Sequence, residues 1–387
     1  MEGFTTFPLR LWIYLASQPT HMTTPFLRVT RTFPEHDIPA DFAPELYQLR
    51  GAFPYQLIPQ LITGDPEQFL RTAALLPPAI TSAIEINCGC PSPNSLGKSA
   101  GSGMLRDAAI FGETIARLQA ELGADRLAVK MRLGIDRPDE FPALLQAIAP
   151  LPLARLTVHG RTRADGYRGH ADWAAIQTAA AAARAPVLAS GDVWGQATLL
   201  QLYQEAPDIH GAMIGRGALR NPWVFAELRE QKPTGMHLHT LINALFCYAL
   251  IQELWQREAG KLIARISKGR IGEPCYGVFE SWEKLTVELT SLIYGLPFLL
   301  LKSSSLTAVS SPASLSSVAF SRLRLLWSYF RSSLPDAFAD ARLLRSKSAG
   351  EFFERLFIVG EPWDRAEALI EIGHRPEWDA HFAGARG

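Results

Sequence analysis

Short apolar segments bounded by turn residues recur along the first part of the chain, and between them lie longer segments with apolar residues at helical spacing. A short apolar run between turn residues indicates a strand, whereas a period of 3.6 residues indicates a helix. The predicted strands cover residues 25–30, 56–62, 83–87, 127–133, 155–159, 186–190 and 211–214. The predicted helices cover residues 7–15, 66–76, 109–122, 141–149, 173–183 and 196–205.

Strands that alternate with helices form a parallel sheet covered by helices, so the fold class is α/β. Seven strands, with room for one more before Met1, favour a closed (β/α)8 TIM barrel over an open doubly wound sheet. No Gly-x-Gly-x-x-Gly follows the first strand, which argues against a dinucleotide-binding sheet. We expect a barrel domain at 1–232 and a C-terminal α-helical domain at 233–387, with an atypical insertion at about 267–320.

The composition is that of an ordinary soluble globular protein, with 48% hydrophobic and 20% charged residues. The formal net charge is zero, so a nucleic-acid partner would have to be met by a local basic patch. The four cysteines do not form a disulfide framework, which indicates a reducing compartment. The N-terminus lacks a secretory pattern, and the longest apolar run, 292–301, is too short to span a membrane. We therefore expect a cytoplasmic protein without membrane contact.

The predicted strand 83–87 ends in Asn87-Cys88-Gly89-Cys90-Pro91, followed by a loop rich in Gly and Ser. This arrangement places Cys90 where the strand stops, a position suited to chemistry, whereas Cys88 fits a buried, inert thiol. A metal site is the alternative for two close cysteines. The remaining cysteines, Cys247 and Cys275, lack metal-ligand spacing, so no metal is predicted.

Polar residues follow the predicted strands at the same end of each strand. In a barrel the carboxyl ends of the strands meet at one mouth, where active sites are built, and the last two strands commonly hold a phosphate. The residues at these strand ends are Gln60, Asn87, Cys90, Lys130, Arg132, His159, Arg161, Ser190, Gly191, Asp192, Gly215 and Arg216. Six sets at one end of successive strands therefore predict an active-site mouth.

Four segments of the chain carry a resemblance to a known family. They are Asn87-Cys88-Gly89-Cys90-Pro91-Ser92, Val129-Lys130-Met131-Arg132-Leu133-Gly134, Val158-His159-Gly160-Arg161-Thr162 with Asp165-Gly166-Tyr167-Arg168, and Met213-Ile214-Gly215-Arg216-Gly217-Ala218-Leu219. In order and spacing they resemble tRNA-dihydrouridine synthases. Val193-Trp194 and the Asp172-Trp173 stretch resemble the DusC-like branch, which modifies position 16 of the tRNA D-loop.

The resemblance implies an FMN-containing barrel followed by a helical tRNA-binding domain, with NADPH as the reductant of the flavin. It implies that flavin contacts come from Met1, Glu2, Gln60, Lys130 and His159, and that the phosphate end is held by Ser190, Gly191, Asp192, Gly215 and Arg216. It further implies that Cys90 donates a proton, with Asn87 and Arg161 on the substrate side.

The implied reaction is the reduction of the C5–C6 double bond of uridine. A hydride would come from flavin N5 and a proton from Cys90, because a thiol with an ordinary pKa of about 8.5 remains protonated at neutral pH. Lys130 beside the flavin would stabilise negative charge on the reduced ring.

A base inside a folded tRNA must leave its stack, and the compensating contacts are expected from the C-terminal part. Between residues 257 and 347, Lys and Arg outnumber Asp and Glu by about two to one. The candidate substrate contacts there are Arg265, Arg322 and Arg324, and a merely solvated helix face is the alternative for each. Since the mouth and this basic part would face one tRNA, we expect a monomer.

Besides the insertion at about 267–320, the chain departs from the family pattern at two places. Met1-Glu2-Gly3 follows the first barrel strand in the family, so we expect that strand to be absent here, and Ser190 stands where the family usually has Asn. Two other functions remain open from the sequence: a flavin barrel oxidoreductase acting on a small molecule of the dihydroorotate or enoate type, and a tRNA-binding relic without flavin.

Overall fold

The computed structural model describes residues 5–30, 42, 45, 55–76, 81–92, 99–123, 125–232, 235–266, 312–364 and 368–372. Its main sheet has seven parallel strands. They are β1 (His21–Arg28), β2 (Gln56–Ile62), β3 (Ile84–Cys88), β4 (Leu127–Arg132), β5 (Arg155–His159), β6 (Val187–Ser190) and β7 (Gly211–Met213).

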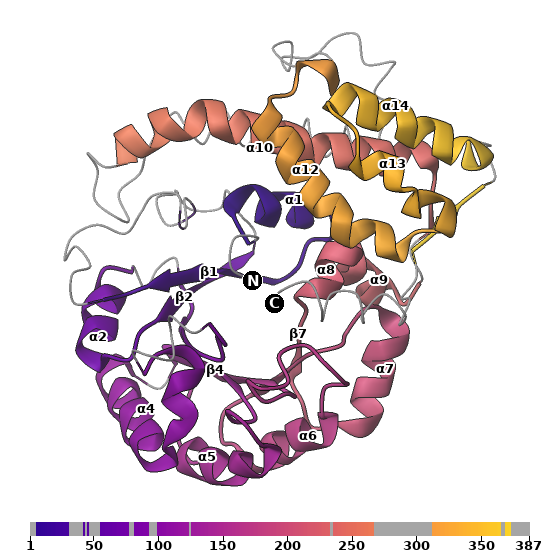
Figure 1. The fold of residues 1–387 in the computed structure, drawn as a ribbon. Coiled ribbons are helices and arrows are strands. Elements are labelled where there is room, and N and C mark those ends of the chain that lie inside the picture. Colours follow the sequence, from indigo (N-terminus) through magenta and orange to yellow (C-terminus); the bar gives the residue numbers. More distant parts are fainter. Residues whose placement is uncertain are drawn as a thin grey trace.

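The strands follow one another around a curled sheet in the order in which they occur in the chain. Helices line the outside of this sheet (Figure 1). The outer helices are α2 (Pro66–Ala74), α4 (Ala108–Leu122), α5 (Phe141–Ile148), α6 (Trp173–Ala182) and α7 (Gln196–Glu205). An aspartate caps the first turn of α2, α4 and α6, where its carboxylate accepts main-chain N–H groups that have no partner within the helix. The predicted barrel of alternating strands and helices is confirmed.

Strands β1 and β7 form the two edges of the sheet, and the described residues contain no ladder that joins them. Within the described residues the main sheet therefore has seven strands.

The first strand differs from its prediction. β1 begins at His21, four residues before the predicted start at Pro25, and it ends at Arg28. The register against β2 shifts between Thr23 and Phe26. Proline has no N–H for the ladder and usually marks the start or the edge of a strand, so Pro25 suggested a beginning where the strand has a bulge.

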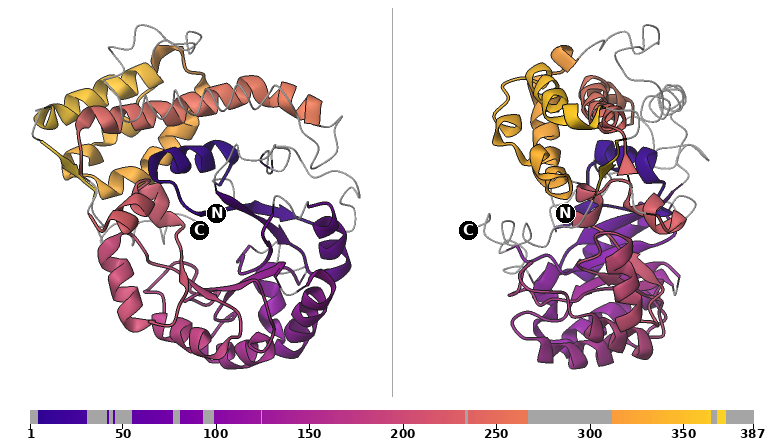
Figure 2. Two further views of the ribbon diagram at one scale, coloured as in Figure 1. Left: turned by 180° about the vertical axis from the view of Figure 1, so that it is seen from behind. Right: turned by 90° about the vertical axis from the view of Figure 1, so that its right-hand side faces the viewer.

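A layer of helices lies across one side of the barrel (Figure 2). It contains α10 (Leu238–Ile266), α12 (Ser317–Phe330), α13 (Ala341–Leu344) and α14 (Ala349–Gly360), together with the small strands β8 (Gly235–Met236) and β9 (Ile370–Glu371). The helices α1 (Phe7–Ser17), α8 (Arg216–Arg220) and α9 (Val224–Glu230) lie where this layer meets the barrel (Figure 1).

Helix α1 attaches the helical layer to the barrel. The fully buried Trp12 donates its indole N–H to the carbonyl oxygen of Ala244 at 2.8 Å, and its ring lies 5.3 Å from that of Tyr248. One continuous hydrophobic cluster includes residues of the barrel helices and of the helical layer. The boundary near residue 232 stays a prediction. Most of the predicted insertion lies outside the described residues, but α12 already begins at Ser317.

Within the described residues, no helix combines the length and the apolar character needed to cross a bilayer. Along the central strands, every second side chain faces the inside of the curled sheet. On β4 these side chains change from a small apolar residue to charged ones toward the carboxyl end, as Ala128, Lys130 and Arg132 show, and on β5 the inward positions are Arg155, Thr157 and His159. The candidate site therefore lies at the carboxyl ends of these strands.

Candidate active site

The loop that follows β3 holds Cys90 in a fixed main-chain position. The side-chain oxygen of Asn87 accepts the N–H groups of Gly89 and Cys90, both at 2.9 Å. The carbonyl oxygen of Cys90 accepts the N–H of Ser102 at 3.1 Å and its hydroxyl at 2.9 Å. The thiol itself is half-buried, whereas the thiol of Cys88 is fully buried, which raises the pKa of Cys88 well above its usual range. Of these two thiols, Cys90 is therefore the one placed to react.

Gly101 allows the main chain to pass close to this thiol. Its φ of +57° lies in the left-handed region, and a Cβ there would come within 3.2 Å of the Cβ of Cys90 and 3.0 Å of its carbonyl oxygen. A larger residue at this position would push the Cys90 loop away.

Arg132 ties the Cys90 loop to the loop after β5. Its side chain is 2% exposed and donates to the carbonyl oxygens of Gly89 at 2.9 Å, Thr162 at 2.7 Å and Gly166 at 2.9 Å. Burial lowers its pKa. Since its donors are used by the chain itself, Arg132 organises the mouth.

Lys130 lies on β4, in register with Asn87 of β3. Among the described residues its ammonium group has no hydrogen bond or ion pair, although Glu85 and Cys90 act on it electrostatically. Burial lowers its pKa from 10.5 to about 8, and the attraction of Glu85 opposes that shift. A cation held in this way is available to a ligand.

His159, at the end of β5, is 6% exposed. Burial and then the nearby cations Arg132 and Lys130 lower its pKa well below the usual range, so the imidazole is neutral at pH 7. Its Nε2 lies 3.3 Å from Nη1 of Arg161. A guanidinium only donates, so Nε2 accepts this bond and the ring proton resides on Nδ1.

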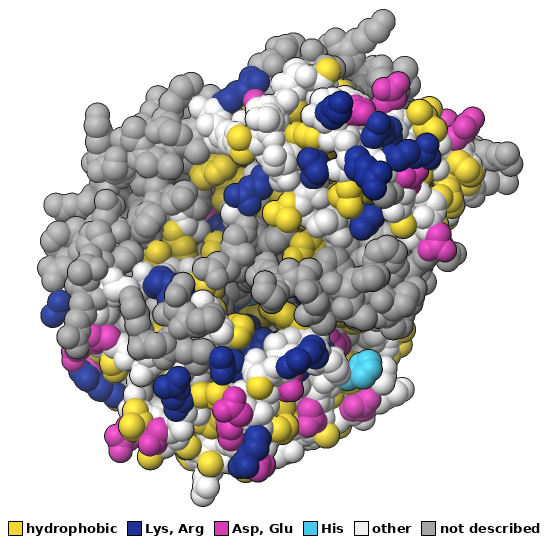
Figure 3. Space-filling model, viewed as in Figure 1, with side chains coloured by type: hydrophobic (Ala, Val, Ile, Leu, Met, Phe, Trp, Pro, Cys, Tyr) yellow, Lys and Arg dark blue, Asp and Glu magenta, His cyan; other side chains and the backbone are white. Residues whose placement is uncertain are grey.

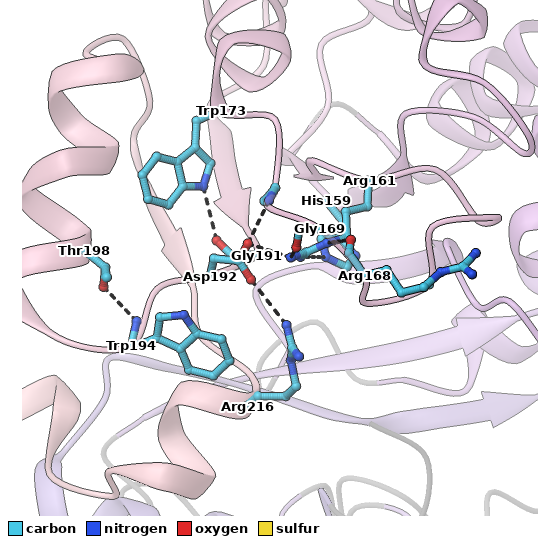
Figure 4. Close-up of polar contacts among 12 residues, drawn as sticks. His159, Arg161, Arg168, Gly169, Trp173, Gly191, Asp192, Trp194, Thr198 and Arg216 are labelled. Carbon is cyan, nitrogen blue, oxygen red and sulfur yellow. Dashed lines mark hydrogen bonds and ion pairs between the residues drawn. The ribbon is translucent and has the colours of Figure 1, made fainter. Parts of the chain in front are cut away.

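The opposite side of the mouth is organised by Asp192 (Figure 4). Its carboxylate accepts from Arg161 at 2.6 Å, from the N–H of Ala171 at 2.7 Å and from Arg216 at 3.3 Å. Asp192 itself has a φ of +59°, and the preceding Gly191 has a φ of +117°. A Cβ on Gly191 would approach Ala171 within 2.8 Å, so this tight turn requires glycine.

Aromatic rings hold the guanidinium of Arg216. It lies 4.5 Å from the ring centre of Tyr167 and 4.9 Å from that of Trp194. Arg220 lies 4.1 Å from the ring of Trp194. Burial lowers the pKa of Arg216, and Asp192 opposes the shift. Arginine over aromatic faces gains from the cation–π attraction and keeps its edge available for an anion.

The structure brings most of the predicted site residues to one mouth. These are Gln60, Asn87, Cys90, Lys130, His159, Arg161, Ser190, Gly191, Asp192, Gly215 and Arg216. Met1 and Glu2 lie outside the described residues, as does the side chain of Arg265. Arg322 and Arg324 lie on α12 in the helical layer, away from the strand ends.

Two of the predicted substrate contacts, Arg161 and Asn87, are already engaged within the protein. Arg161 is 3% exposed, and besides Asp192 it binds the carbonyl oxygens of Arg168 at 3.1 Å and Gly169 at 2.6 Å. Asn87 is also engaged, by its own loop. A direct contact of either residue with substrate stays a prediction, whereas their contacts here position the loops.

Several residues of the mouth were not among the predicted site residues: Glu85, Ser102, Tyr167 and Trp194. For Glu85 the signal was available, because it lies at an inward position of a strand. For Ser102, Tyr167 and Trp194 the position in the mouth depends on how loops meet.

The groups at this mouth fit a flavin mononucleotide. Lys130 offers an ammonium without a protein partner among the described residues, and the neutral His159 offers an N–H. On the other side, Arg216 stands at the beginning of α8, directly after Gly215, where a Cβ would meet no atom within 4 Å. A cation and open main chain suit a phosphate, and the donors suit the carbonyl oxygens of a flavin ring.

Comparison with known proteins identifies sequence relatives of the chain. The profile of the family described as "Dihydrouridine synthase (Dus)" matches residues 1–272. A Pseudomonas putida protein named tRNA-dihydrouridine synthase B is 33% identical over 180 residues, which is 46% of this chain and 53% of the relative. Another from the same organism, named tRNA-dihydrouridine(16) synthase, is 28% identical over 70% of this chain and 84% of the relative.

A more distant relative comes from the fungus Malassezia globosa. It is named tRNA-dihydrouridine(47) synthase [NAD(P)(+)] and is 29% identical over 49% of this chain and 28% of its own length. The chain spans about half of the length of the B-type relatives, 53% and 54% for the two Pseudomonas proteins.

Proposed function

Because this chain belongs to the dihydrouridine synthase family, we propose that it reduces uridine in tRNA to 5,6-dihydrouridine, with FMN as the bound cofactor and NADPH as the reductant. The observation that carries this proposal is the juxtaposition of the fixed Cys90 loop and the Lys130 ammonium at the carboxyl ends of β3 and β4. The names of the relatives support the substrate, and the donor groups of the mouth support a flavin.

Bound reduced flavin would supply the hydride for one carbon of the C5–C6 double bond. Cys90 would hold the proton for the neighbouring carbon, which makes it the catalytic residue. Its main chain is bound on the N–H side by Asn87 and on the carbonyl side by Ser102. An acid fixed in this way loses little freedom when substrate binds, and general acids contribute about 10²–10⁴-fold to a rate.

Lys130 would place positive charge beside the flavin ring and so stabilise negative charge there. His159 would add a neutral N–H donor, since its Nε2 is engaged by Arg161. Asp192 would hold Arg161 and Arg216 in place, so that Arg216 could bind the phosphate end together with the main chain at Ser190, Gly191 and Gly215. Gln60 would contact the ring from β2.

The surface of the helical layer supports tRNA as the substrate. Figure 3 shows Lys and Arg side chains gathered on the upper part of one face, over α12, α13 and α14. The exposed basic residues there include Arg324, Arg342, Arg345 and Lys347. Such residues bind phosphates without reading sequence. We therefore assign tRNA binding to the part from 233 to 387, with Arg265 and Arg322 as further candidate contacts.

The relative named for position 16 aligns over 84% of its own length, which favours position 16 of the D-loop as the target. A single chain would suffice, because its mouth and its basic face belong to one molecule, and a monomer in the cytoplasm is the proposed state.

The proposal is tested by incubating the purified full chain with FMN, NADPH and an unmodified tRNA transcript, followed by mass spectrometry of the digested RNA. The expected result is dihydrouridine at position 16, absent when NADPH is omitted. Turnover of free uracil, orotate or an enone without any change in tRNA would instead support a small-molecule oxidoreductase. Protein that binds tRNA but takes up no FMN would support a tRNA-binding relic.

A further inference from the structure

Glu85 is a fully buried carboxylate that the proposed reaction does not use. It lies in the middle of β3 at an inward position, with 0% exposure. Its Oε2 lies 3.2 Å from Nη2 of Arg155 and 3.5 Å from the hydroxyl of Thr157, and its Oε1 accepts from Nε2 of Gln60 at 2.5 Å. Burying a charge is costly, so its retention needs an explanation beyond packing.

A chain of hydrogen bonds leads from Glu85 to Cys90. Gln60 gives an N–H to Glu85 and, with its Oε1, accepts Nδ2 of Asn87 at 2.7 Å. Asn87 then accepts, with its Oδ1, the main-chain N–H groups of Gly89 and Cys90 at 2.9 Å. Each amide side chain thus has its donor directed toward Glu85 and its acceptor directed toward the Cys90 loop.

The direction of this chain follows from the chemistry of its first member. An ionised carboxylate only accepts hydrogen bonds, so the NH2 group of Gln60 must face Glu85. The oxygen of Gln60 then faces Asn87, the NH2 group of Asn87 must face Gln60, and the oxygen of Asn87 is left for the loop. Reversing any one amide would place two acceptors or two donors against each other in a buried site, at a cost of about 1–3 kcal/mol.

We propose that Glu85 is a positioning residue that fixes the direction of the Gln60–Asn87 amide pair and thereby holds the Cys90 loop in its reactive position. This inference rests on the proposed function only where it gives Cys90 the role of proton donor. The same direction leaves the second N–H of each amide for a ligand, so the amides would offer donors to carbonyl oxygens, the groups that a uracil and a flavin ring both present.

Three variants test the direction of the hydrogen-bond chain. In Asn87→Asp, the carboxylate still accepts the loop N–H groups but turns its other oxygen against Oε1 of Gln60, which cannot turn while Glu85 is charged. In Glu85→Gln, the new amide still accepts from Gln60, although the ion pair with Arg155 is lost. In the double variant, the new carboxylate at position 87 accepts from Gln60, and Oε1 of Gln60 accepts from the new amide at position 85. The donors and acceptors of the hydrogen-bond chain are then reversed, and each of its hydrogen bonds still joins a donor to an acceptor.

The readout that does not depend on tRNA is amide hydrogen exchange of the Gly89 and Cys90 N–H groups in the full chain. We expect about tenfold faster exchange in Asn87→Asp than in the wild-type protein, less than about threefold change in Glu85→Gln, and recovery to within about threefold in the double variant. The single-turnover rate of uridine reduction should follow the same order. If no variant and no wild-type protein reduces tRNA, the proposed function fails, while the exchange data still decide this inference.

Relief of repulsion between two carboxylates would also favour the double variant, and a matched background separates the two explanations. Gln60→Leu cuts the hydrogen-bond chain. In this background Asn87→Asp still places a second carboxylate beside that of Glu85, and Glu85→Gln still removes one of the two. Recovery that disappears in this background supports the proposal. Recovery that persists there assigns the effect to charge repulsion and overturns the proposal, as does a double variant that exchanges as fast as Asn87→Asp or does not fold.

Discussion

The two halves of the barrel mouth are built from different interactions. The thiol half, formed by Gln60, Glu85, Asn87 and Cys90, is a series of neutral amide hydrogen bonds that starts from one remote carboxylate. The arginine half, formed by Arg161, Asp192 and Arg216, is a group of ion pairs reinforced by aromatic rings (Figure 4). The first half fixes a position, and the second concentrates charge.

This difference matches the two tasks that the mouth would perform. A proton donor must be held at a defined distance from one carbon, which neutral, directional bonds achieve. The anionic end of a cofactor needs positive charge that is already in place before binding, which Asp192 provides by orienting two guanidinium groups. Substitutions in the thiol half should therefore lower the rate of uridine reduction. Substitutions in the arginine half should lower the stability of the protein and its affinity for the cofactor.

The largest effect is expected from the thiol half. Cys90→Ala should lower the single-turnover rate of uridine reduction by about 10²–10⁴-fold, because the general acid is lost, while FMN binding stays close to that of the wild-type protein. Cys90→Ser is the matched control: its hydroxyl keeps the size of the group but is a far weaker acid, so it should be nearly as slow. A Cys90→Ala protein as fast as wild type would remove Cys90 from the mechanism.

In the arginine half, Asp192→Asn should lower the free energy of unfolding by about 3 kcal/mol, measured by urea denaturation, because an uncompensated buried charge is strongly destabilising. The charge in question is that of Arg161, 3% exposed, which would lose its carboxylate partner. FMN should also bind more weakly because Arg216 loses an anchor. Asp107→Asn is the control, since Asn caps a helix about as well as Asp. Equal unfolding midpoints for the two variants would contradict the ion-pair account.

Lys130 connects the two halves, and its pKa of about 8 predicts a pH dependence. The affinity of the protein for FMN should fall as the pH rises above about 8, by at most about tenfold per pH unit, because the cation is lost. Lys130→Met should bind FMN weakly at every pH, and Lys130→Arg should show no such fall. Affinity that stays constant to pH 10 in the wild-type protein would exclude Lys130 as the cation that matters.

The effect of the same group on stability has the opposite sign. The pKa of Lys130 lies below the 10.5 of an unperturbed lysine, so between these values the unfolded chain holds a proton that the folded chain has released. This group therefore adds stability as the pH rises from about 8 to about 10.5, and Lys130→Met should remove that contribution.

The smallest effect is expected outside the mouth. Arg324→Glu on α12 should weaken tRNA binding several-fold and lower the slope of log affinity against log salt concentration by about 1. Arg184→Glu, an exposed site in the loop between α6 and β6 at the other end of the barrel, serves as the control with the same change of charge. If both variants behave alike, the helical layer is not the tRNA surface.

The strands of the barrel were largely predictable from the sequence. The bounds of β2 and β5 match the predicted 56–62 and 155–159, because short apolar runs end there in clear turn residues. β1 was misplaced, since Pro25 lies inside a strand that bulges around it. Local pattern thus gives the elements, but it does not show where a ladder tolerates a proline.

The individual polar residues of the mouth were also visible in the sequence, whereas their connections were not. The inward position of Glu85 follows from a period of two along β3, but its partner Gln60 is set by the register between β2 and β3. The stack of Arg216 between Tyr167 and Trp194 joins loops from three different strand ends. Such contacts arise only when the curled sheet brings these strand ends together.

The central claim is tested most directly by the visible absorption of the full chain, purified in the presence of FMN and followed without oxygen. The account predicts a flavin band that NADPH bleaches and that unmodified tRNA then restores in the wild-type protein but not in Cys90→Ala. A colourless protein, or a bleached band that tRNA leaves unchanged, would contradict it.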